Sequence, residues 1–379
     1  MGSIKQVADS KLAELQARHL RRTAATTHRR PGAVVERGVQ RTISFSCNDY
    51  LGLTHHPAVK RAAIAAIETY GVGAGASRLV TGNHPLYAQL EERLARFEDS
   101  EAACVFGSGY LANLGTIPTW IGPEDLFLAD ALSHACVLAG GRQSGATEHL
   151  YRHDDIDDCE RLLRAHRLAH RRCLIATDSV FSMDGDRARL AELAELARDH
   201  DAWLLVDEAH GLGLLTGAEA ETAPAIDLRV GTLSKALGSY GGFVAGSKAA
   251  VDLLLNRARS LIYSTGLPPA SLAAAIAALD VIESDPARRA RPVERARQFA
   301  TALGLRAPTS AIVPLLVGEA VEALSASERL AEAGFLVVAI RPPTVPEGTS
   351  RLRFSFSADH SEDDVEALAQ AVRSLGYTG

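Results

Sequence analysis

The chain has 379 residues, of which 47% are hydrophobic and 23% charged, and its formal net charge is -6. This composition is typical of a packed globular protein, and it disfavours extensive disorder, a fibrous repeat and the binding of nucleic acid or anionic lipid. At roughly 150 residues per domain, the length predicts two domains, which can enclose a cleft.

Short apolar runs alternate with helical patterns along most of the chain. Residues 1–43 are expected to form an N-terminal arm, with an amphipathic helix at 7–22 and a linker at 29–32. The segment 44–284 is expected to form a large domain, because its strand and helix patterns alternate. Its strands are predicted at 102–106, 126–129, 173–177, 203–206 and 243–246, and its helices at 57–70, 85–97, 190–200 and 269–282. Alternation of this kind predicts a mostly parallel sheet wrapped by helices.

The last part of the chain, residues 285–379, is expected to form a smaller α+β domain. An Arg-rich helix is predicted to begin near Pro286, and strands are predicted at 312–317, 336–340 and 351–356. The fold class is therefore predicted to be α/β, with a large cofactor-binding domain and a small C-terminal domain. The arm is expected to pack with the small domain.

The cysteine content and the N-terminus bear on the compartment. The five cysteines are odd in number and form no C-x-x-C pair, which favours reduced thiols. The N-terminus lacks the pattern of a secretory signal, and no run of about 18 apolar residues, enough to span a membrane, follows it. These observations predict a cytoplasmic protein.

Polar motifs follow the predicted strands, at the ends where open α/β sheets bind ligands. The motif Asp-Glu-Ala-His-Gly at 207–211 follows one strand, and Lys235 lies in a turn of small and polar residues at 231–238. Taken alone, Asp207 is as well explained as a cap of the next turn, and a lone loop lysine is usually a solvated charge.

Together the two residues indicate a specific chemistry. A lysine that holds pyridoxal 5'-phosphate (PLP) as a Schiff base needs an electron-withdrawing ring, and a carboxylate keeps the ring nitrogen protonated. We therefore predict a PLP enzyme in which Lys235 carries the cofactor and Asp207 pairs with the pyridinium. His210 is predicted to donate to the phenolic oxygen of the ring, although a lone histidine is more often structural.

A phosphate site is predicted where the strand at 102–106 runs into a Gly-rich turn with Gly109 and Tyr110. The N–H groups and the dipole of the helix that opens there suit a phosphate, although a single G-x-G is more often an ordinary turn. Thr232 and Ser234, in the same turn as Lys235, can add hydroxyl donors.

Motifs at 46–53, 73–78, 182–186, 207–211 and 231–235 together resemble the α-oxoamine synthase family of fold-type I PLP enzymes. The resemblance covers nearly the whole chain in the same order. It implies decarboxylative condensation of an amino acid with an acyl thioester, and the short N-terminus and the segment 340–349 narrow this to L-alanine and pimeloyl-CoA or pimeloyl-acyl carrier protein, as in biotin biosynthesis. It also implies a homodimer with interface active sites. The net charge and the lack of a long apolar run predict no nucleic-acid or membrane partner.

The resemblance implies roles for individual residues. Catalytic roles are implied for Lys235, His134, Asp207 and His210, with His134 stacked on the ring. Cofactor contacts are implied for Gly109, Tyr110, His134, Ser182, Asp207, His210, Thr232, Ser234, Lys235 and Thr265. Substrate contacts are implied for Arg21, Asn48, Arg341, Thr344 and Arg353, with Arg341 or Arg353 on the amino-acid carboxylate. A surface ion pair is the alternative for each arginine.

The chain departs from the family pattern after the motif at 207–211, where a short Ala-rich segment at 218–226 replaces a longer loop. This departure leaves the acyl specificity open. Other members of the family that use glycine, serine or threonine with a different acyl-CoA are alternatives. So are a PLP aminotransferase and a catalytically silent homologue, although the intact set of Asp207, His210 and Lys235 argues against the last.

More distant alternatives lack further motifs or residues that they require. Asp-Glu-Ala-His is also a helicase motif, but the sequence has no G-x-x-x-x-G-K-[ST] phosphate loop. The dinucleotide-like glycines at 71–76 follow a predicted helix, and no G-x-S-x-G nucleophile elbow occurs. His149 and His153 have the i, i+4 spacing of metal ligands but lack an acidic third ligand, so no metal site is predicted.

Overall fold

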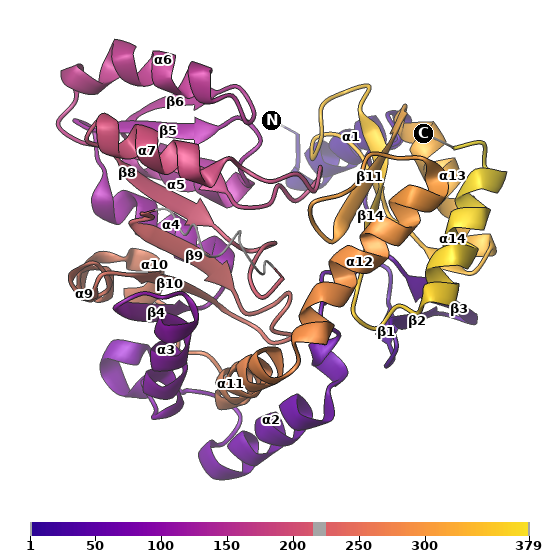
Figure 1. Cartoon of the computed structure of the whole chain (residues 1–379), viewed down its shortest axis with the longest axis horizontal. Coiled ribbons are helices and arrows are strands. Elements are labelled where there is room, and N and C mark those ends of the chain that lie inside the picture. The colour runs from indigo at the N-terminus through magenta and orange to yellow at the C-terminus, as the bar shows by residue number, and fades with distance from the viewer. Residues whose placement is uncertain (1, 215–224, 378–379) are drawn as a thin grey trace. The chain divides into compact units, whose positions relative to one another are not determined.

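The computed structural model of the chain describes residues 2–214 and 225–377. They divide into two compact units, which are labelled by element in Figure 1. The large unit comprises Asp49–Ser182 and Asp186–Arg291, and the small unit comprises Met1–Asn48, Met183–Gly185 and Pro292–Gly379. The predicted boundaries at 43/44 and 284/285 stay a prediction. Residues 218–224 of the Ala-rich segment lie outside the described residues.

The large unit is built on a seven-stranded sheet with the order β4-β10-β9-β8-β7-β5-β6. Its strands are β4 Ala102–Phe106, β5 Leu126–Asp130, β6 Thr147–Tyr151, β7 Cys173–Asp178, β8 Trp203–Asp207, β9 Leu228–Thr232 and β10 Gly242–Gly246. The strands from β9 to β6 are parallel, whereas β10 is antiparallel to both of its neighbours. The predicted, mostly parallel sheet is confirmed.

Helices cover both faces of this sheet, because successive side chains of a strand point to opposite faces. In β5, Phe127 packs in a cluster with residues of α4, α5, α9 and α10, whereas Leu128 packs in a cluster with residues of α6 and α7. The helices of the unit are α2 Pro57–Tyr70, α3 Leu86–Phe97, α4 Gly109–Trp120, α5 Ala135–Ser144, α6 Ile156–His166, α7 Leu190–Asp199, α9 Lys248–Arg257, α10 Arg259–Ile262 and α11 Pro269–Ser284. Strands covered on both faces form near-continuous apolar runs, which is why most of them were predictable.

Two strands of the sheet were missed by the sequence prediction. β6 is an edge strand whose residues Thr147–Tyr151 are mostly half-buried or exposed, so it lacks an apolar run. β9 ends at Thr232, inside the segment predicted to be a turn at 231–238. The correction matters for β9, because its end leads directly to Lys235.

The small unit contains two sheets, with the orders β1-β2-β3-β12 and β11-β14-β13. Their strands are β1 His28–Arg29, β2 Val34–Arg37, β3 Gln40–Ser44, β11 Ile312–Gly318, β12 Phe335–Leu336, β13 Ala339–Ile340 and β14 Ser350–Ser355. Helices α13 Ala320–Glu332, α14 Glu362–Ser374 and the later part of α12 Pro286–Leu303 pack around a core that includes Phe45 and Phe354.

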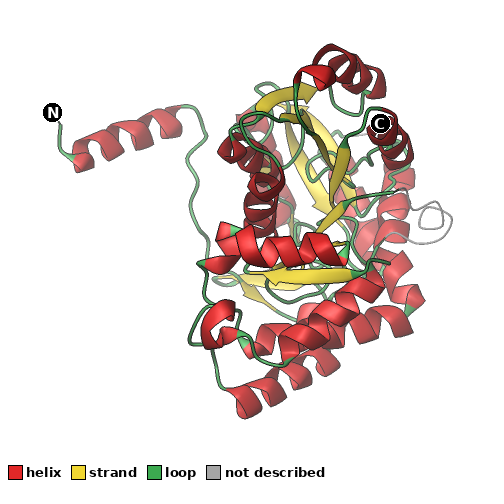
Figure 2. Ribbon diagram, turned by 90° about the vertical axis from the view of Figure 1, so that its left-hand side faces the viewer, coloured by secondary structure: helices red, strands yellow, loops and turns green. Residues whose placement is uncertain are grey.

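The N-terminal arm differs from its prediction. Its helix, α1, spans Ile4–Ala17 rather than 7–22, buries no residue and is followed by a long loop (Figure 2). The short strands β1, β2 and β3, which were not predicted, pair with one another, and residues 30–32 of the predicted linker form the turn between β1 and β2. Among residues 2–214 and 225–377, no helix combines the length and the hydrophobicity needed to cross a bilayer.

Candidate active site

Three buried carboxylates mark the carboxyl edge of the large sheet. Asp130, Asp178 and Asp207 are the last residues of β5, β7 and β8, and each is at most 5% exposed. Asp178 lies opposite Asp207 in the parallel pairing of β7 with β8. The strand register therefore gathers these acids at one edge, where α/β sheets bind their ligands.

Asp207 is held by donors on both carboxylate oxygens. Its Oδ2 accepts a hydrogen bond of 2.7 Å from Asn113 Nδ2 on α4, and its Oδ1 accepts one of 2.9 Å from the Ala209 main chain. The same Asn113 amide nitrogen lies 3.2 Å from Cys136 Sγ on α5. The carboxylate is thus fixed in one orientation, as a partner of a pyridinium nitrogen must be.

Asp178 has a different environment from its neighbour. Burial and the negative charge of Asp207 raise the pKa of Asp178 well above its usual range. Its Oδ2 accepts a hydrogen bond of 3.0 Å from the His134 main chain. Asp178 therefore holds the main chain of His134, the residue that is predicted to stack on the cofactor.

Lys235 and His210 are in contact, as their predicted roles require. Lys235 Nζ lies 2.8 Å from His210 Nε2, and His210 Nδ1 lies 2.7 Å from the Tyr50 hydroxyl. Lys235 Nζ and the Tyr50 hydroxyl thus contact the two nitrogens of the same imidazole ring. Tyr50 is fully buried, so its hydroxyl holds the His210 imidazole on the side that faces the core.

His134 caps helix α5 with its own ring. Its Nδ1 accepts a hydrogen bond of 3.3 Å from the Cys136 main chain and lies 2.8 Å from Cys136 Sγ. Although part of the residue is exposed, desolvation and the charge of Lys235 lower the pKa of His134, with Asp207 opposing them. Burial and the charge of Asp207 raise the pKa of the Cys136 thiol to about 12. The His134 imidazole is therefore uncharged, and its contacts with Cys136 fix its orientation.

A candidate phosphate site lies at the N-terminus of α4. Ser108 caps this helix by accepting from Leu111 N at 3.1 Å. As in every helix, the N–H groups of the first turn have no partner inside the helix, and such groups can bind a phosphate. An added Cβ at Gly109 would lie 3.4 Å from Thr232 Cβ, so the turn and the end of β9 are adjacent. Thr232 and Ser234 share a hydroxyl contact of 2.7 Å.

The residues at this edge fit PLP. Lys235 supplies an amine, Asp207 a carboxylate for the ring nitrogen, His134 a flat ring, and the start of α4 a phosphate cradle. Three buried polar atoms, Asn113 Oδ1, Ser133 Oγ and Ser179 Oγ, have no hydrogen-bond partner in the described structure. Buried polar atoms are normally satisfied, so these orphans are consistent with a missing polar ligand.

The predicted substrate residues lie in the small unit. Arg353, on β14, is 5% exposed and donates to Asn48 Oδ1 at 3.2 Å and to Ser355 Oγ at 2.7 Å. Arg341 donates to the His19 carbonyl, and burial together with the charge of Arg22 lowers the pKa of Arg341. The two candidates for the amino-acid carboxylate therefore have distinct surroundings.

The predicted acyl contacts Arg21 and Thr344 stay predictions. Thr344 Oγ1 accepts a hydrogen bond of 2.9 Å from Arg22, and Arg21 and Arg22 are both exposed. Of the other predicted cofactor residues, Ser182 is half-buried and Thr265 is exposed. Thr265 forms an isolated bridge with Ser77.

The weak metal pattern at His149 and His153 is not a ligand pair. His149 stacks on His166 with centroids 4.0 Å apart, and His153 contacts two aspartates. The described part of the chain contains no group of three potential ligands that could hold a metal ion.

Sequence reasoning missed Tyr50, Asn113, Cys136 and Asp178 as members of the site. Two of them, Asn113 and Asp178, could have been identified from their positions in the sequence. Asn113 follows the Gly-rich turn by one helical turn, and Asp178 ends an apolar strand as Asp207 does. Tyr50 and Cys136 are brought in only by tertiary packing.

Comparisons with known proteins agree on the family. The profile described as aminotransferase class I and II matches residues 40–372. An 8-amino-7-oxononanoate synthase from Methylobacterium nodulans is 58% identical over 377 residues, which cover 100% of this chain and 98% of that protein. One from Methylocella silvestris is 58% identical over 343 residues, covering 89% of this chain and 98% of that protein.

Solved structures are also similar to the chain. A serine palmitoyltransferase from S. paucimobilis with a bound PLP-myriocin aldimine has a TM-score of 0.91 at 28% identity, covering 99% of this chain and 100% of that chain. An 8-amino-7-oxononanoate synthase from Francisella tularensis has a TM-score of 0.74 at 28% identity, covering 88% of this chain and 98% of that chain.

Proposed function

We propose a specific reaction for this chain, which belongs to the class I and II aminotransferase family and, within it, to the α-oxoamine synthases. The reaction is the PLP-dependent condensation of L-alanine with pimeloyl-CoA or pimeloyl-acyl carrier protein. Its products are 8-amino-7-oxononanoate, carbon dioxide and the free thiol. The observation that carries the proposal is the contact of 2.8 Å between Lys235 Nζ and His210 Nε2, beside Asp207 at the sheet edge. The full-length relatives named above narrow the substrates.

PLP bound to Lys235 supplies an electron-withdrawing ring, which stabilises negative charge at the amino-acid Cα. Asp207, fixed by Asn113 and Ala209, holds the proton of the ring nitrogen. His210, anchored by Tyr50, directs its Nε2 towards Lys235 Nζ and the ring oxygen. His134 covers one ring face and excludes water from it.

Lys235 is then the group that moves protons. Its amine would remove the Cα proton of alanine. As the Cα–acyl carbon bond forms, the C–S bond of the thioester would break, and the thiolate would take up that proton and leave as the free thiol. When the alanine carboxylate departs as carbon dioxide, Lys235 would deliver a proton from solvent to Cα in its place. We assign Arg353 to that carboxylate, since a bidentate contact fixes which Cα bond breaks.

We also propose that a second copy of the chain completes the site. Apolar side chains at Val72, Val80 and Tyr263 are 77%, 73% and 74% exposed. The two segments that carry them are joined by the bridge of Ser77 with Thr265 and by a hydrogen bond of 2.9 Å from Gly266 N to the Ala76 carbonyl. Contiguous exposed apolar surface is typical of an interface. The cytoplasmic location remains a prediction.

The test is a substrate panel with purified protein and PLP. Alanine, glycine, serine and threonine are each combined with pimeloyl-CoA, pimeloyl-acyl carrier protein and palmitoyl-CoA, and free thiol and carbon dioxide are measured. We expect alanine with a pimeloyl thioester to give the highest kcat/KM. A higher value for glycine or serine with another acyl group would contradict the substrate assignment and leave the family unchanged.

Lys235→Ala is the matched negative variant, and Lys248→Ala, at an exposed lysine paired with Asp252, is its control. Borohydride reduction should attach the cofactor to position 235 in the wild type and in Lys248→Ala only. Because the family profile is named for aminotransferases, pyruvate is measured in parallel. Pyruvate formation without thiol release would favour an aminotransferase.

A further inference from the structure

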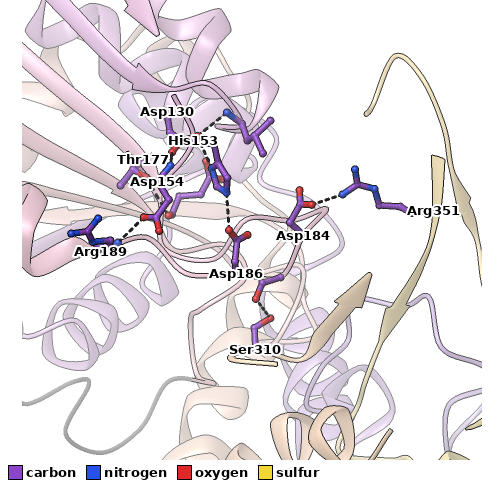
Figure 3. Close-up of polar contacts among 12 residues, drawn as sticks. Asp130, His153, Asp154, Thr177, Asp184, Asp186, Arg189, Ser310 and Arg351 are labelled. Carbon is purple, nitrogen blue, oxygen red and sulfur yellow. Dashed lines mark hydrogen bonds and ion pairs between the residues drawn. The ribbon is translucent and has the colours of Figure 1, made fainter. Parts of the chain in front are cut away.

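His153 is a histidine of the large unit that the proposed reaction does not use. It lies on the loop after β6, and Figure 3 shows its ring pointing towards two aspartates. Its Nδ1 is 3.0 Å from Asp130 Oδ1 and its Nε2 is 2.7 Å from Asp186 Oδ2. The Phe181 ring packs edge-on against it with centroids 4.4 Å apart.

The imidazole carries a positive charge at neutral pH. Carboxylate oxygens only accept, so both ring nitrogens must carry a proton to make these contacts. Burial on its own lowers the pKa of a histidine, but here the hydrogen bonds with Asp130 and Asp186 outweigh it and raise the pKa of His153 to about 10. The ring is a charged bridge between two acids.

One of these acids shapes the loop that leads to His134. Asp130 Oδ1 accepts a hydrogen bond of 2.8 Å from Leu132 N, and its main-chain oxygen accepts one of 3.0 Å from Ser133 N. Its Oδ2 accepts a further bond of 2.9 Å from Asp154 N. The turn before His134 is therefore built around the Asp130 carboxylate.

The other acid closes the loop that begins with Ser182. The Asp186 main-chain oxygen accepts a hydrogen bond of 3.0 Å from Phe181 N, and a bridge of Val180 with Arg187 flanks it. Residues 183–185, at the tip of this loop, belong to the small unit. There Asp184 pairs with Arg351, and the Gly185 carbonyl accepts a bond of 2.6 Å from Ser310, as Figure 3 shows.

We propose that His153 is a positioning residue that fixes the two loops bearing His134 and Ser182, so that both side chains meet the cofactor in one arrangement. The proposal rests on the proposed function, because it takes both residues to be cofactor contacts. The charged His153 ring contacts Asp130 at the base of one loop and Asp186 at the base of the other. Without it, Asp130 and Asp186 would lose their common partner and leave two negative charges close together.

The experiment compares His153→Gln and Asp186→Asn with the wild type. Purified apoprotein of each is titrated with PLP, and the visible circular dichroism of the bound cofactor and the unfolding midpoint are recorded. We expect His153→Gln to bind PLP about 10-fold more weakly, the effect of one lost coupling interaction, and to lose much of the visible dichroism. The double variant should be little worse than either single variant, since both remove the same bridge.

His149→Gln is the matched control, because this histidine also lies beside the β6 edge but stacks on His166. It should leave PLP affinity and dichroism unchanged. A His153→Gln protein with a lower unfolding midpoint but wild-type affinity and dichroism would overturn the positioning role. If His153→Gln does not fold, Asp186→Asn decides by the same two measurements. If the wild type itself fails to link PLP to Lys235, the proposed function fails, which is a separate outcome.

Discussion

The carboxyl edge of the large sheet and the substrate-binding segments of the small unit differ in how their polar residues are placed. Asp130, Asp178 and Asp207 each end a strand, so the sheet register fixes their spacing. Arg341 and Thr344, in contrast, lie in the irregular segment between β13 and β14. The first arrangement is dictated by the hydrogen bonds of the sheet, whereas the second has only turn hydrogen bonds, such as Thr344 N to the Arg341 carbonyl, and side-chain contacts. We therefore expect the residues that bind the cofactor to be held more rigidly than the residues that select the acyl group.

A half-buried and a buried histidine differ in charge in the same way. His153, in the large unit, has a carboxylate on each ring nitrogen and is charged. His360, in the small unit, stacks on Phe45 with centroids 3.9 Å apart and contacts only main-chain groups. Burial lowers the pKa of His360 to about 4. Burial therefore sets the charge of a histidine only where no acid opposes it.

The largest expected effect comes from removing the amide that orients Asp207. Asn113→Leu keeps the volume similar but removes the donor at 2.7 Å from Asp207 Oδ2. A hydrogen bond to a charged group contributes about 1.5 to 3 kcal/mol, so we expect kcat to fall roughly 10- to 100-fold. The visible spectrum of bound PLP should change as well, which a loss of packing alone would not cause.

Asn256→Leu is the control for this change, because the Asn256 amide is exposed on α9 and donates to the Asp252 carbonyl. It should leave both the spectrum and kcat unaltered. An Asn113→Leu enzyme with normal turnover and a normal spectrum would show that Asp207 needs no second donor.

A smaller effect should separate the two arginine candidates. Arg353→Lys keeps the charge but loses the planar fork that binds a carboxylate through two hydrogen bonds. We expect the KM for alanine to rise about 10-fold, the equivalent of one charge-assisted hydrogen bond. Arg341→Lys should instead raise the KM for the acyl thioester. Both values come from steady-state kinetics with each substrate varied in turn.

Arg373→Lys, at an exposed arginine of α14 that donates to the Ala302 carbonyl, is the control and should change neither constant. If Arg341→Lys raises the KM for alanine and Arg353→Lys does not, the carboxylate assignment must be exchanged.

The sequence predicted the cofactor side of the site well for a physical reason. Apolar strands such as 173–177 and 203–206 are read directly from residue patterns, and in a parallel sheet their ends share one edge. Asp207 was identified at one of those ends, and Lys235 from its chemistry in a predicted turn. The pairing of Lys235 with His210 confirms that these two motifs meet in space.

The contacts that depend on tertiary packing were not predictable. Nothing in the sequence near Tyr50 indicates that its hydroxyl meets His210, which is 160 positions away along the chain. The short strand His28–Arg29 is formed by pairing with its neighbour and has no apolar run of its own, and the single strand predicted at 336–340 is divided into Phe335–Leu336 and Ala339–Ile340, which pair in different sheets.

The smallest expected effect concerns the stability of the small unit at acidic pH. His360 is neutral in the fold, since Nδ1 accepts from Ser357 N and Nε2 donates to the Ser44 carbonyl, each at 3.0 Å. Its pKa is about 4 when folded and 6.5 when unfolded, so the unfolded chain binds more protons between these values. The stabilisation is complete above pH 6.5 and is lost as the pH falls towards 4. From pH 6 to 5 this residue should lower the free energy of unfolding by about 1 kcal/mol. Urea unfolding at both pH values measures the slope, and His360→Gln should reduce it by that amount. An unchanged slope in the variant would show that folding does not lower the pKa of His360 and that other groups set the acid sensitivity.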